Sequence, residues 1–498
     1  MSNIENSQIN RKGTDHLKNV PDHDKRFGIY KIFQPKILQV CTNRYLVLVT
    51  LSLGSMFLQA ITNGFPSVSW RTLEIKFHLN SAQTGWLSSC YEIANTALSV
   101  IIIHFLQEVH KPIWIGIGLF VTGIGGIIYC LPHFVSDPYI FNDLDIFTSC
   151  QGSSSFNKKT LYIFLLAFGQ LLAGAGSVTN NVFSLTYIDE NIKRKQVPMY
   201  HTFYLIIGIV GVTIGLIGGG LLLLVSTDFH RPHSEMVTEF ITINNQTVAN
   251  PFWVGAWWLG PLICSCCLIF LSFIIYCLPR RFGKEIHFTD GDKWVSFFGS
   301  LKKIAKNKIW WMVVIATSAD AWLIQCFAAF VVKQGAMTFM IESSKMAWVA
   351  GIVLILGTLV GYLISGLVLH RWKDDDKQKY IKMGVYCLIG PVISFAATFA
   401  FLVGCDNYAI QWMVYGGLAA SSPDPNSIPV PTCESWKFPF WCFCIAMLML
   451  GAFMNVVPYL QLQIQKVPTA YREQSIAWNS VISRCVGSIP GPIIFGYL

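Results

Sequence analysis

The stretch WVGAWWLGPLICSCCLIFLSFIIYCL, residues 253–278, combines two features that rarely occur together in a soluble protein. It places three tryptophans within six positions, and an apolar run of membrane-spanning length follows them directly. Tryptophan prefers the boundary between lipid and water, and about 20 apolar residues cross the hydrocarbon core as a helix. The stretch therefore predicts a transmembrane helix that begins at an aromatic boundary.

The composition of the whole chain fits the same environment. Of its 498 residues, 53% are hydrophobic and only 13% are charged, which is about half the charged share of a soluble protein. We therefore predict an all-α polytopic membrane protein, since apolar runs of spanning length recur along the chain. The predicted spans are residues 45–66, 85–106, 113–133, 161–186, 200–226, 253–279, 309–332, 346–369, 383–404 and 439–463, with an eleventh from about residue 473.

The distribution of Lys and Arg predicts the orientation. Most of these residues lie in the tail and loops on the side of the N-terminus, and few lie in the loops on the other side. This bias predicts a cytoplasmic N-terminus, and it accounts for the net charge of +9 without a nucleic-acid partner. We expect residues 1–44 to be a cytoplasmic tail without a signal peptide, and Asn245 to be glycosylated on the outer side.

Two cysteines, Cys405 and Cys433, bracket one predicted outer loop. Disulfides persist on that side of a membrane, so a disulfide between them is one interpretation and two free thiols are the other. Most of the remaining cysteines lie in apolar runs, where we interpret them as small buried hydrophobic residues. Their spacing is not that of metal ligands, and we expect neither a metal nor a cofactor.

A basic segment, residues 280–308, divides the predicted spans into two sets. Six spans precede it in residues 45–279, and five follow it in residues 309–498. Six spans, a cytoplasmic loop and a second set of spans are typical of major facilitator transporters, which are built from two six-helix halves. We expect this fold, with a truncated second half that lacks a twelfth span.

Several motifs occur in the same order as in a known family. WVGAWWLG begins the sixth span, YEIAN (residues 91–95) lies in the second, and VPTAYREQSIAWNSVISRCVGSIPGPIIFG (residues 467–496) includes the eleventh. These motifs resemble the organic anion transporting polypeptides, the solute carrier organic anion transporter family, over residues 45–498. The resemblance implies a transporter of the plasma membrane rather than an enzyme.

The resemblance also implies a function. Members of this family transport large amphipathic organic anions, such as bile salts, steroid conjugates, prostanoids and thyroid hormones, independently of sodium and by anion exchange. We expect the substrate to bind in the bilayer between two halves that expose it alternately to each side. A truncated membrane protein that does not transport is the alternative. A proton-coupled symporter of another facilitator family is a third hypothesis.

The sequence departs from the family pattern at several places. Asn250 and Phe252 replace the aspartate and arginine of the tryptophan motif, and Gln59 stands where some members have a lysine in the first span. The loop at residues 405–438 is too short for the family's cysteine-rich domain. Gln59 stays a candidate substrate contact, whereas the absent domain and the absent twelfth span favour the non-transporting alternative.

Arg484 is the only Lys or Arg within a predicted span, and it is our leading candidate for binding an anion. A cation near the middle of a spanning helix costs about 2.5–3.5 kcal/mol on insertion scales, so it must face protein or water. A guanidinium can bind a carboxylate or a sulfate with two hydrogen bonds. The alternative is a structural ion pair with Glu92 or with Asp320, an intramembrane acid to which we assign no role.

Two further groups of residues have two interpretations each. Glu92 and His133 are at similar depth. Either they share a proton, which implies pH-sensitive uptake or the binding of a small counter-anion such as bicarbonate, or Glu92 fixes helix packing and His133 faces lipid headgroups. Trp253, Trp257 and Trp258 either form an aromatic wall that stacks on sterol-like substrates or anchor the helix at the lipid–water boundary.

Overall fold

The computed structural model of the protein is helical almost throughout. Asn245, Cys405, Cys433 and most of the segment 280–308 lie outside the residues that the structure describes, so the glycosylation and the disulfide stay predictions. The described residues are 28, 44–105, 109–138, 153–192, 197–229, 240–243, 246–249, 253–280, 301–302, 304–339, 341–371, 379–397, 434–456, 458–459, 462–463, 467 and 472–497.

The helices of the first half follow the predicted spans. They are α2 (Arg44–Gln59), η3 (Ala60–Gly64), α3 (Phe65–Phe77), α4 (Ser81–Phe105), α5 (Lys111–Val135), α7 (Ser153–Asn191), α8 (Val197–Leu223) and α9 (Leu259–Tyr276). The elements α2, η3 and α3 form one helix that contains a π turn. This helix continues past its predicted end at residue 66 and stops where His78 adopts a left-handed conformation with a φ of 50°.

The second half contributes a second set of helices. They are α11 (Lys308–Phe339), α12 (Ser343–Arg371), α13 (Lys379–Ala397), α15 (Lys437–Met454), α17 (Arg472–Ser483), η8 (Arg484–Ser488) and α18 (Pro490–Tyr497). The last three follow one another as a single helix with a π turn in its middle. An antiparallel hairpin of β1 (Phe240–Ile243) and β2 (Gln246–Ala249) lies between α8 and α9 in the chain.

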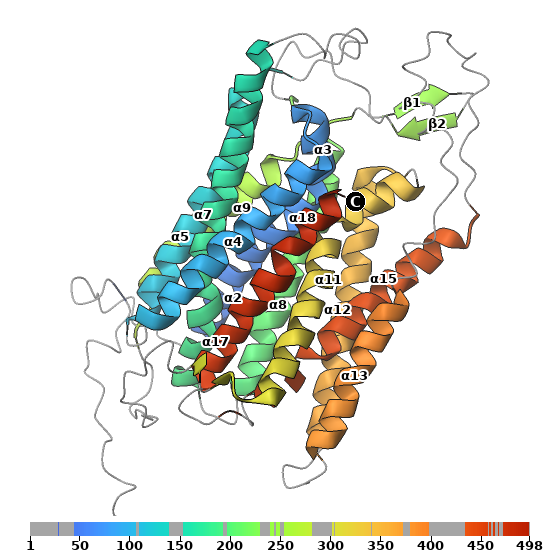
Figure 1. The fold of residues 1–498 in the computed structure, drawn as a ribbon. Helices are drawn as coiled ribbons and strands as arrows, with labels where there is room; N and C mark the ends of the chain where they lie inside the picture. The colour runs from blue at the N-terminus through green and yellow to red at the C-terminus, as the bar shows by residue number, and fades with distance from the viewer. Residues whose placement is uncertain are drawn as a thin grey trace, which may run out of the picture.

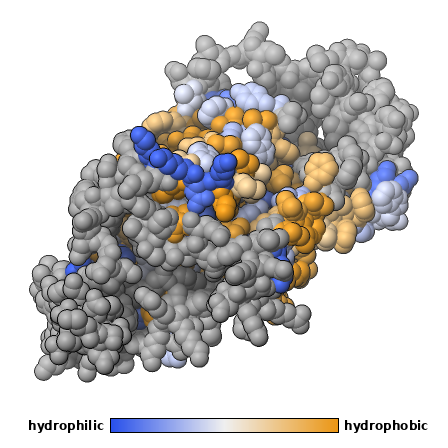
Figure 2. Space-filling view, turned by 60° about the horizontal axis from the view of Figure 1, so that its bottom comes forward, coloured by the Kyte–Doolittle hydropathy of each residue, from blue (hydrophilic) through white to orange (hydrophobic). Residues whose placement is uncertain are grey.

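The arrangement of apolar side chains shows that these helices cross a membrane. Each of the eleven predicted spans contains a helix, and eight helices in the described part of the chain are long and apolar enough to span a bilayer. Large apolar side chains point outward: Phe270 is 68% exposed, and Leu367 and Leu388 are each 67% exposed. Figure 2 shows such residues over much of the described surface. The chain is therefore a multi-pass membrane protein, as predicted.

Glycines on α8 let this helix lie directly against the first helix. A Cβ atom added to Gly215 would be 2.6 Å from the Cα atom of Gly64, closer than such atoms can approach. A Cβ atom added to Gly211 would overlap the backbone carbonyl of Met56. These small residues therefore form a close helix–helix contact, which is typical of membrane proteins.

The two sets of helices form two halves. In Figure 1, α5, α7 and α9 lie on one side of the molecule and α12, α13 and α15 lie on the other, with α4, α11 and α18 between them. The halves meet where α4 packs on the helix α17–η8–α18, where α8 packs on α12, and where α3 packs on α11. We call the end of the bundle at which α3 is followed by α4 the α3–α4 end.

Candidate functional site

Arg484 lies near the middle of the helix α17–η8–α18, at the first position of the π turn. The backbone N–H of Ile489 donates a hydrogen bond of 2.9 Å to the carbonyl oxygen of Arg484, five residues earlier, which defines the π turn. A π turn of this kind often marks a functional position in a helix. The side chain of Arg484 is 22% exposed, so it is partly open rather than enclosed.

Arg484 forms an ion pair with Glu92 across the interface between the halves. Oε2 of Glu92, on α4, lies 3.7 Å from Nε of Arg484. Nε2 of Gln325, on α11, donates a hydrogen bond of 2.5 Å to the other carboxylate oxygen of Glu92. Of the two partners that the sequence suggested for Arg484, Glu92 and Asp320, the structure pairs it with Glu92. Glu92 of the first half thus contacts both Arg484 and Gln325 of the second half.

This ion pair leaves hydrogen-bonding capacity unused. Nη1 of Arg484 and Oε2 of Glu92 are buried, and neither forms a hydrogen bond with the described residues. Glu92 is more enclosed than its partner, with a side chain that is 8% exposed. A guanidinium has five N–H donors, so one that reaches its partner through Nε keeps donors at its terminal nitrogens for a second anion.

Gln59 lies at a second π turn, in the first helix. It directly precedes η3, and its Oε1 accepts a hydrogen bond of 2.6 Å from Nδ2 of Asn63. Its side chain is half-buried. None of the described contacts joins Gln59 to Arg484, so a role for Gln59 in substrate binding stays a prediction.

His133 is fully buried near the end of α5. Its Nδ1 lies 3.3 Å from Nζ of Lys76, and its ring stacks on Trp258 with centroids 4.4 Å apart and planes 11° apart. The interpretation that His133 faces lipid headgroups is wrong, because the side chain is 0% exposed. The contacts described for Glu92 involve Arg484 and Gln325 instead, so proton sharing between Glu92 and His133 stays a prediction.

The three tryptophans pack into the protein at the α3–α4 end. Trp257 and Trp258 are 3% and 6% exposed, so their interpretation as a lipid-facing anchor is wrong. The indole nitrogen of Trp258 donates to the carbonyl oxygen of Thr227 at 3.1 Å, and that of Trp253 donates to Leu223 at 2.7 Å. These bonds tie the start of α9 to the end of α8.

Asp320 is buried on α11, and the side chains near it are Tyr459 and Cys387. The nearby hydroxyl of Ser318 donates to the backbone carbonyl of Val314 at 2.7 Å. The ion pair described for Arg484 is with Glu92. Among the described residues, therefore, Asp320 is not part of the central ion pair.

A second ion pair between the halves lies at the α3–α4 end, and the sequence did not predict it. Nζ of Lys333, on α11, lies 2.6 Å from Oε1 of Glu74, on α3. Thr84 donates a hydrogen bond of 2.8 Å to the same oxygen, and Lys333 donates one of 2.7 Å to Ser81. The sequence offered one indication of this pair, the charged residues Arg71, Glu74 and Lys76. The predicted span ended at residue 66 and did not include them.

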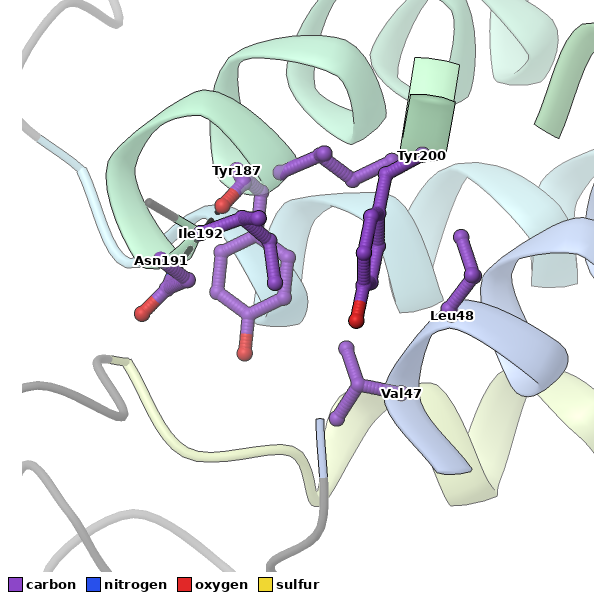
Figure 3. Close-up of a pocket in the computed structure, with 7 residues that line it drawn as sticks. Val47, Leu48, Tyr187, Asn191, Ile192 and Tyr200 are labelled. Carbon is purple, nitrogen blue, oxygen red and sulfur yellow. Dashed lines mark hydrogen bonds between the residues drawn. The ribbon is translucent and has the colours of Figure 1, made fainter. Parts of the chain in front are cut away.

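A pocket of about 250 Å³, part of it open to solvent, lies at the opposite end of the first half. Figure 3 shows the rings of Tyr187 and Tyr200 pointing from α7 and α8 toward Val47 on α2. Its lining also includes Leu48, Ile188, Asn191 and Ile192. These residues carry no charge, so the pocket does not provide the cation that an organic anion needs.

Similar solved structures identify the fold. A bacterial homolog of the human lysosomal transporter Spinster, in an inward-facing and unoccupied conformation, matches with a TM-score of 0.58 at 17% identity, over 90% of this chain and 81% of that chain. The D-xylose-proton symporter matches with a TM-score of 0.56 at 9% identity, over 90% and 89% of the two chains. The fold is therefore that of a major facilitator transporter.

Sequence comparison identifies the family. A sequence model of the Organic Anion Transporter Polypeptide (OATP) family matches residues 45–435, and the chain belongs to this family. Human solute carrier organic anion transporter family member 4C1 is 28% identical over 404 residues, 76% of this chain and 54% of that protein. Mouse member 4A1 is 24% identical over 583 residues, 94% of this chain and 76% of that protein.

The chain spans about half the length of the member 4C1 proteins that it matches. The family and the similar structures are transporters and not enzymes. The matched residues include the tryptophan motif, so its resemblance to this family is confirmed, whereas the helix around Arg484 lies beyond the match and its resemblance stays a prediction.

Proposed function

We propose that this protein transports amphipathic organic anions across a membrane by alternating access. Arg484 is the observation that carries the proposal, because it is a partly open cation between the halves with a buried Nη1 that forms no hydrogen bond in the described structure. A carboxylate or sulfate has the geometry to accept two hydrogen bonds from a guanidinium. The names of the relatives, organic anion transporters, support the same class of substrate.

The finer parts of the proposal rest on the family. We propose bile salts, steroid conjugates, prostanoids or thyroid hormones as substrates, moved without sodium and in exchange for another anion such as bicarbonate. The location would be the plasma membrane, with a cytoplasmic N-terminus. Under this orientation the α3–α4 end faces the outside, which agrees with the positive-inside bias of the loops.

The contacts between the halves support a state that is closed to the outside. The ion pair of Glu74 with Lys333 links the halves at the α3–α4 end. Arg71 donates to Ser343 at 3.3 Å near the same end. The likeness to an inward-facing transporter agrees with this state. In alternating access, these contacts would break when the substrate enters from outside.

Uptake of a labelled steroid sulfate into cells that express the full chain tests the proposal. We expect saturable uptake with the wild-type chain and background uptake with Arg484→Ala at a matched surface level, because the alanine removes the cation. The matched control is Lys345→Ala, which removes a cation whose side chain is 67% exposed at the start of α12. This control should transport like the wild type.

Two results would contradict the proposal. Background uptake by the wild-type chain at the cell surface would favour a membrane protein that does not transport. Full uptake by Arg484→Ala would show transport that does not use this cation. Uptake that requires an inward proton gradient and is not stimulated by internal anions would instead favour a proton-coupled symporter.

A further inference from the structure

The central ion pair connects two bodies that must move relative to each other. Glu92 belongs to α4 in the first half, and Arg484 belongs to η8 in the second. Both residues lie near the middle of their helices. Halves that rock about a central site separate mainly at their ends. A pair in the middle can therefore stay close in both orientations of the transporter.

The charges at this position determine what the unloaded transporter can do. Among the described residues, Glu92 is the acid within ion-pair distance of Arg484. An uncompensated cation in a site that is closed to water on both sides is strongly unfavourable. The unloaded transporter passes through such a closed state whenever it reorients, so something must neutralise Arg484 when no substrate is bound.

We propose that Glu92 is a tethered substitute for the substrate anion in the unloaded transporter. It neutralises Arg484 while the empty site reorients, and the substrate's carboxylate or sulfate displaces it on binding. The inference rests on the proposed function and deepens it. It assigns to Glu92 a capacity for net transport in addition to the proposed exchange, since a transporter that can reorient only when loaded is restricted to exchange.

The geometry suits a displaceable partner. The distance of 3.7 Å to Arg484 is long for an ion pair, and Oε2 of Glu92 forms no hydrogen bond with the described residues. The other oxygen, Oε1, accepts the bond of 2.5 Å from Gln325. A carboxylate anchored through one oxygen can release the guanidinium from the other without losing all of its partners.

The experiment compares net uptake with exchange for Glu92→Gln. Labelled steroid sulfate uptake is measured in bicarbonate-free medium, in cells that have not been preloaded and in cells preloaded with unlabelled steroid sulfate, at matched surface level. We expect net uptake to fall at least tenfold while exchange persists, so the ratio of exchange to net uptake rises at least tenfold. The KM in exchange should fall at least threefold, because the competing carboxylate is gone.

Two further variants complete the experiment. Asp320→Asn removes a buried acid that is not paired with Arg484. Its ratio of exchange to net uptake should equal that of the wild type. Glu92→Asp keeps the charge on a shorter side chain, and its ratio should lie between those of the wild type and Glu92→Gln. If Glu92→Gln does not reach the surface, Glu92→Asp alone decides: a ratio above that of the wild type supports the proposal, and an unchanged ratio overturns it.

The outcomes separate this inference from the proposed function. Equal ratios for Glu92→Gln and the wild type, or loss of exchange together with net uptake at normal surface level, would overturn the tethered role while anion transport by the wild type stands. Background uptake by the wild-type chain in both conditions would instead overturn the proposed function, and the inference with it.

Discussion

The two ion pairs that join the halves differ in their distance and in how many of their polar atoms form hydrogen bonds. At the α3–α4 end, Lys333 and Glu74 lie 2.6 Å apart, and Ser81 and Thr84 add hydrogen bonds of 2.7 and 2.8 Å to them. In the middle, Arg484 and Glu92 lie 3.7 Å apart. There, a buried nitrogen and a buried oxygen form no hydrogen bond with the described residues.

This difference distinguishes a contact that holds the halves together from a site that can bind a ligand. We call the ion pair of Lys333 and Glu74 the latch. The outer pair has its partners within the protein, so it can hold the halves together without any ligand. The central pair is incomplete, and a buried donor without a partner costs about 1–3 kcal/mol, which a bound anion would recover. A comparison of variants at the two pairs therefore tests whether one closes the transporter and the other binds its substrate.

Exchanging the two charges within each ion pair should produce the largest difference in uptake between the two sites. Arg484→Glu combined with Glu92→Arg keeps the pair but moves the cation to α4, so we expect uptake of steroid sulfate to fall about a hundredfold or more. Removal of a buried, hydrogen-bonded charge typically costs about 3–5 kcal/mol. Lys333→Glu combined with Glu74→Lys keeps a latch of the same kind, and uptake should stay within about twofold. Equal losses in the two exchanged variants would refute the distinction.

Gln325→Leu should have the next largest effect. It removes the hydrogen bond to Glu92, and bonds to charged groups contribute about 1.5–3 kcal/mol. Glu92 then depends on Arg484 alone and competes more strongly with the substrate, so the KM for uptake should rise about tenfold. Thr317→Val on the same helix removes a bond of 2.8 Å to Asn479 and serves as the control. A KM that does not rise in Gln325→Leu would mean that Gln325 does not anchor Glu92.

Glu74→Gln should loosen the latch. Partly exposed ion pairs contribute about 1 kcal/mol, which corresponds to about a fivefold change in population. Spin labels at His78 and Lys345 lie on different halves, and double electron–electron resonance measures the distance between them. We expect the population of the longer distance to rise about fivefold. Lys158→Gln removes an ion pair with Asp137 that lies within the first half, and it should leave the distances unchanged. A distance distribution identical to that of the wild type in Glu74→Gln would assign closure to other contacts.

Trp258→Phe should have the smallest effect on transport. His133 and Phe229 both stack on Trp258, with interplanar angles of 11° and 3°, so its ring offers little face to a sterol. The variant loses the bond to Thr227, and a neutral hydrogen bond contributes about 1 kcal/mol to stability. We therefore expect a slightly lower Tm and a KM within about twofold of wild type. A several-fold rise in KM would restore the interpretation of an aromatic wall.

Hydrophobic length and charge distribution were sufficient to predict most of the fold. All eleven spans contain helices, because apolar runs of that length have few other stable arrangements in lipid. The same reasoning found Arg484, since a lone cation in an apolar run must have a partner or a function. The predicted candidates for that partner included Glu92, which the structure confirms.

The remaining features depend on contacts between distant helices. Gln325 is one neutral polar residue among many, and only the packing of α11 beside α4 gives it a role at Glu92. Glu74 and Lys333 are 259 residues apart in the chain, so their pairing requires the arrangement of the two halves. The tryptophan motif suggested a lipid boundary, but tertiary packing against α5 and α8 buries two of its rings.

The π turn at residues 484–488 determines how α18 is rotated about the axis of the last helix. Such a turn holds about one residue more than an α-helical turn, and one residue corresponds to about 100° of rotation. Conversion of this π turn to ordinary α geometry at the same chain length would therefore rotate α18 by roughly this angle relative to α17. Gly496, which now faces the backbone of Ser81, would then turn away from α4. Loss of the π turn at constant chain length would thus disturb the interface between the halves without removing any polar group, whereas a one-residue deletion that restores α geometry would leave α18 in nearly the same orientation.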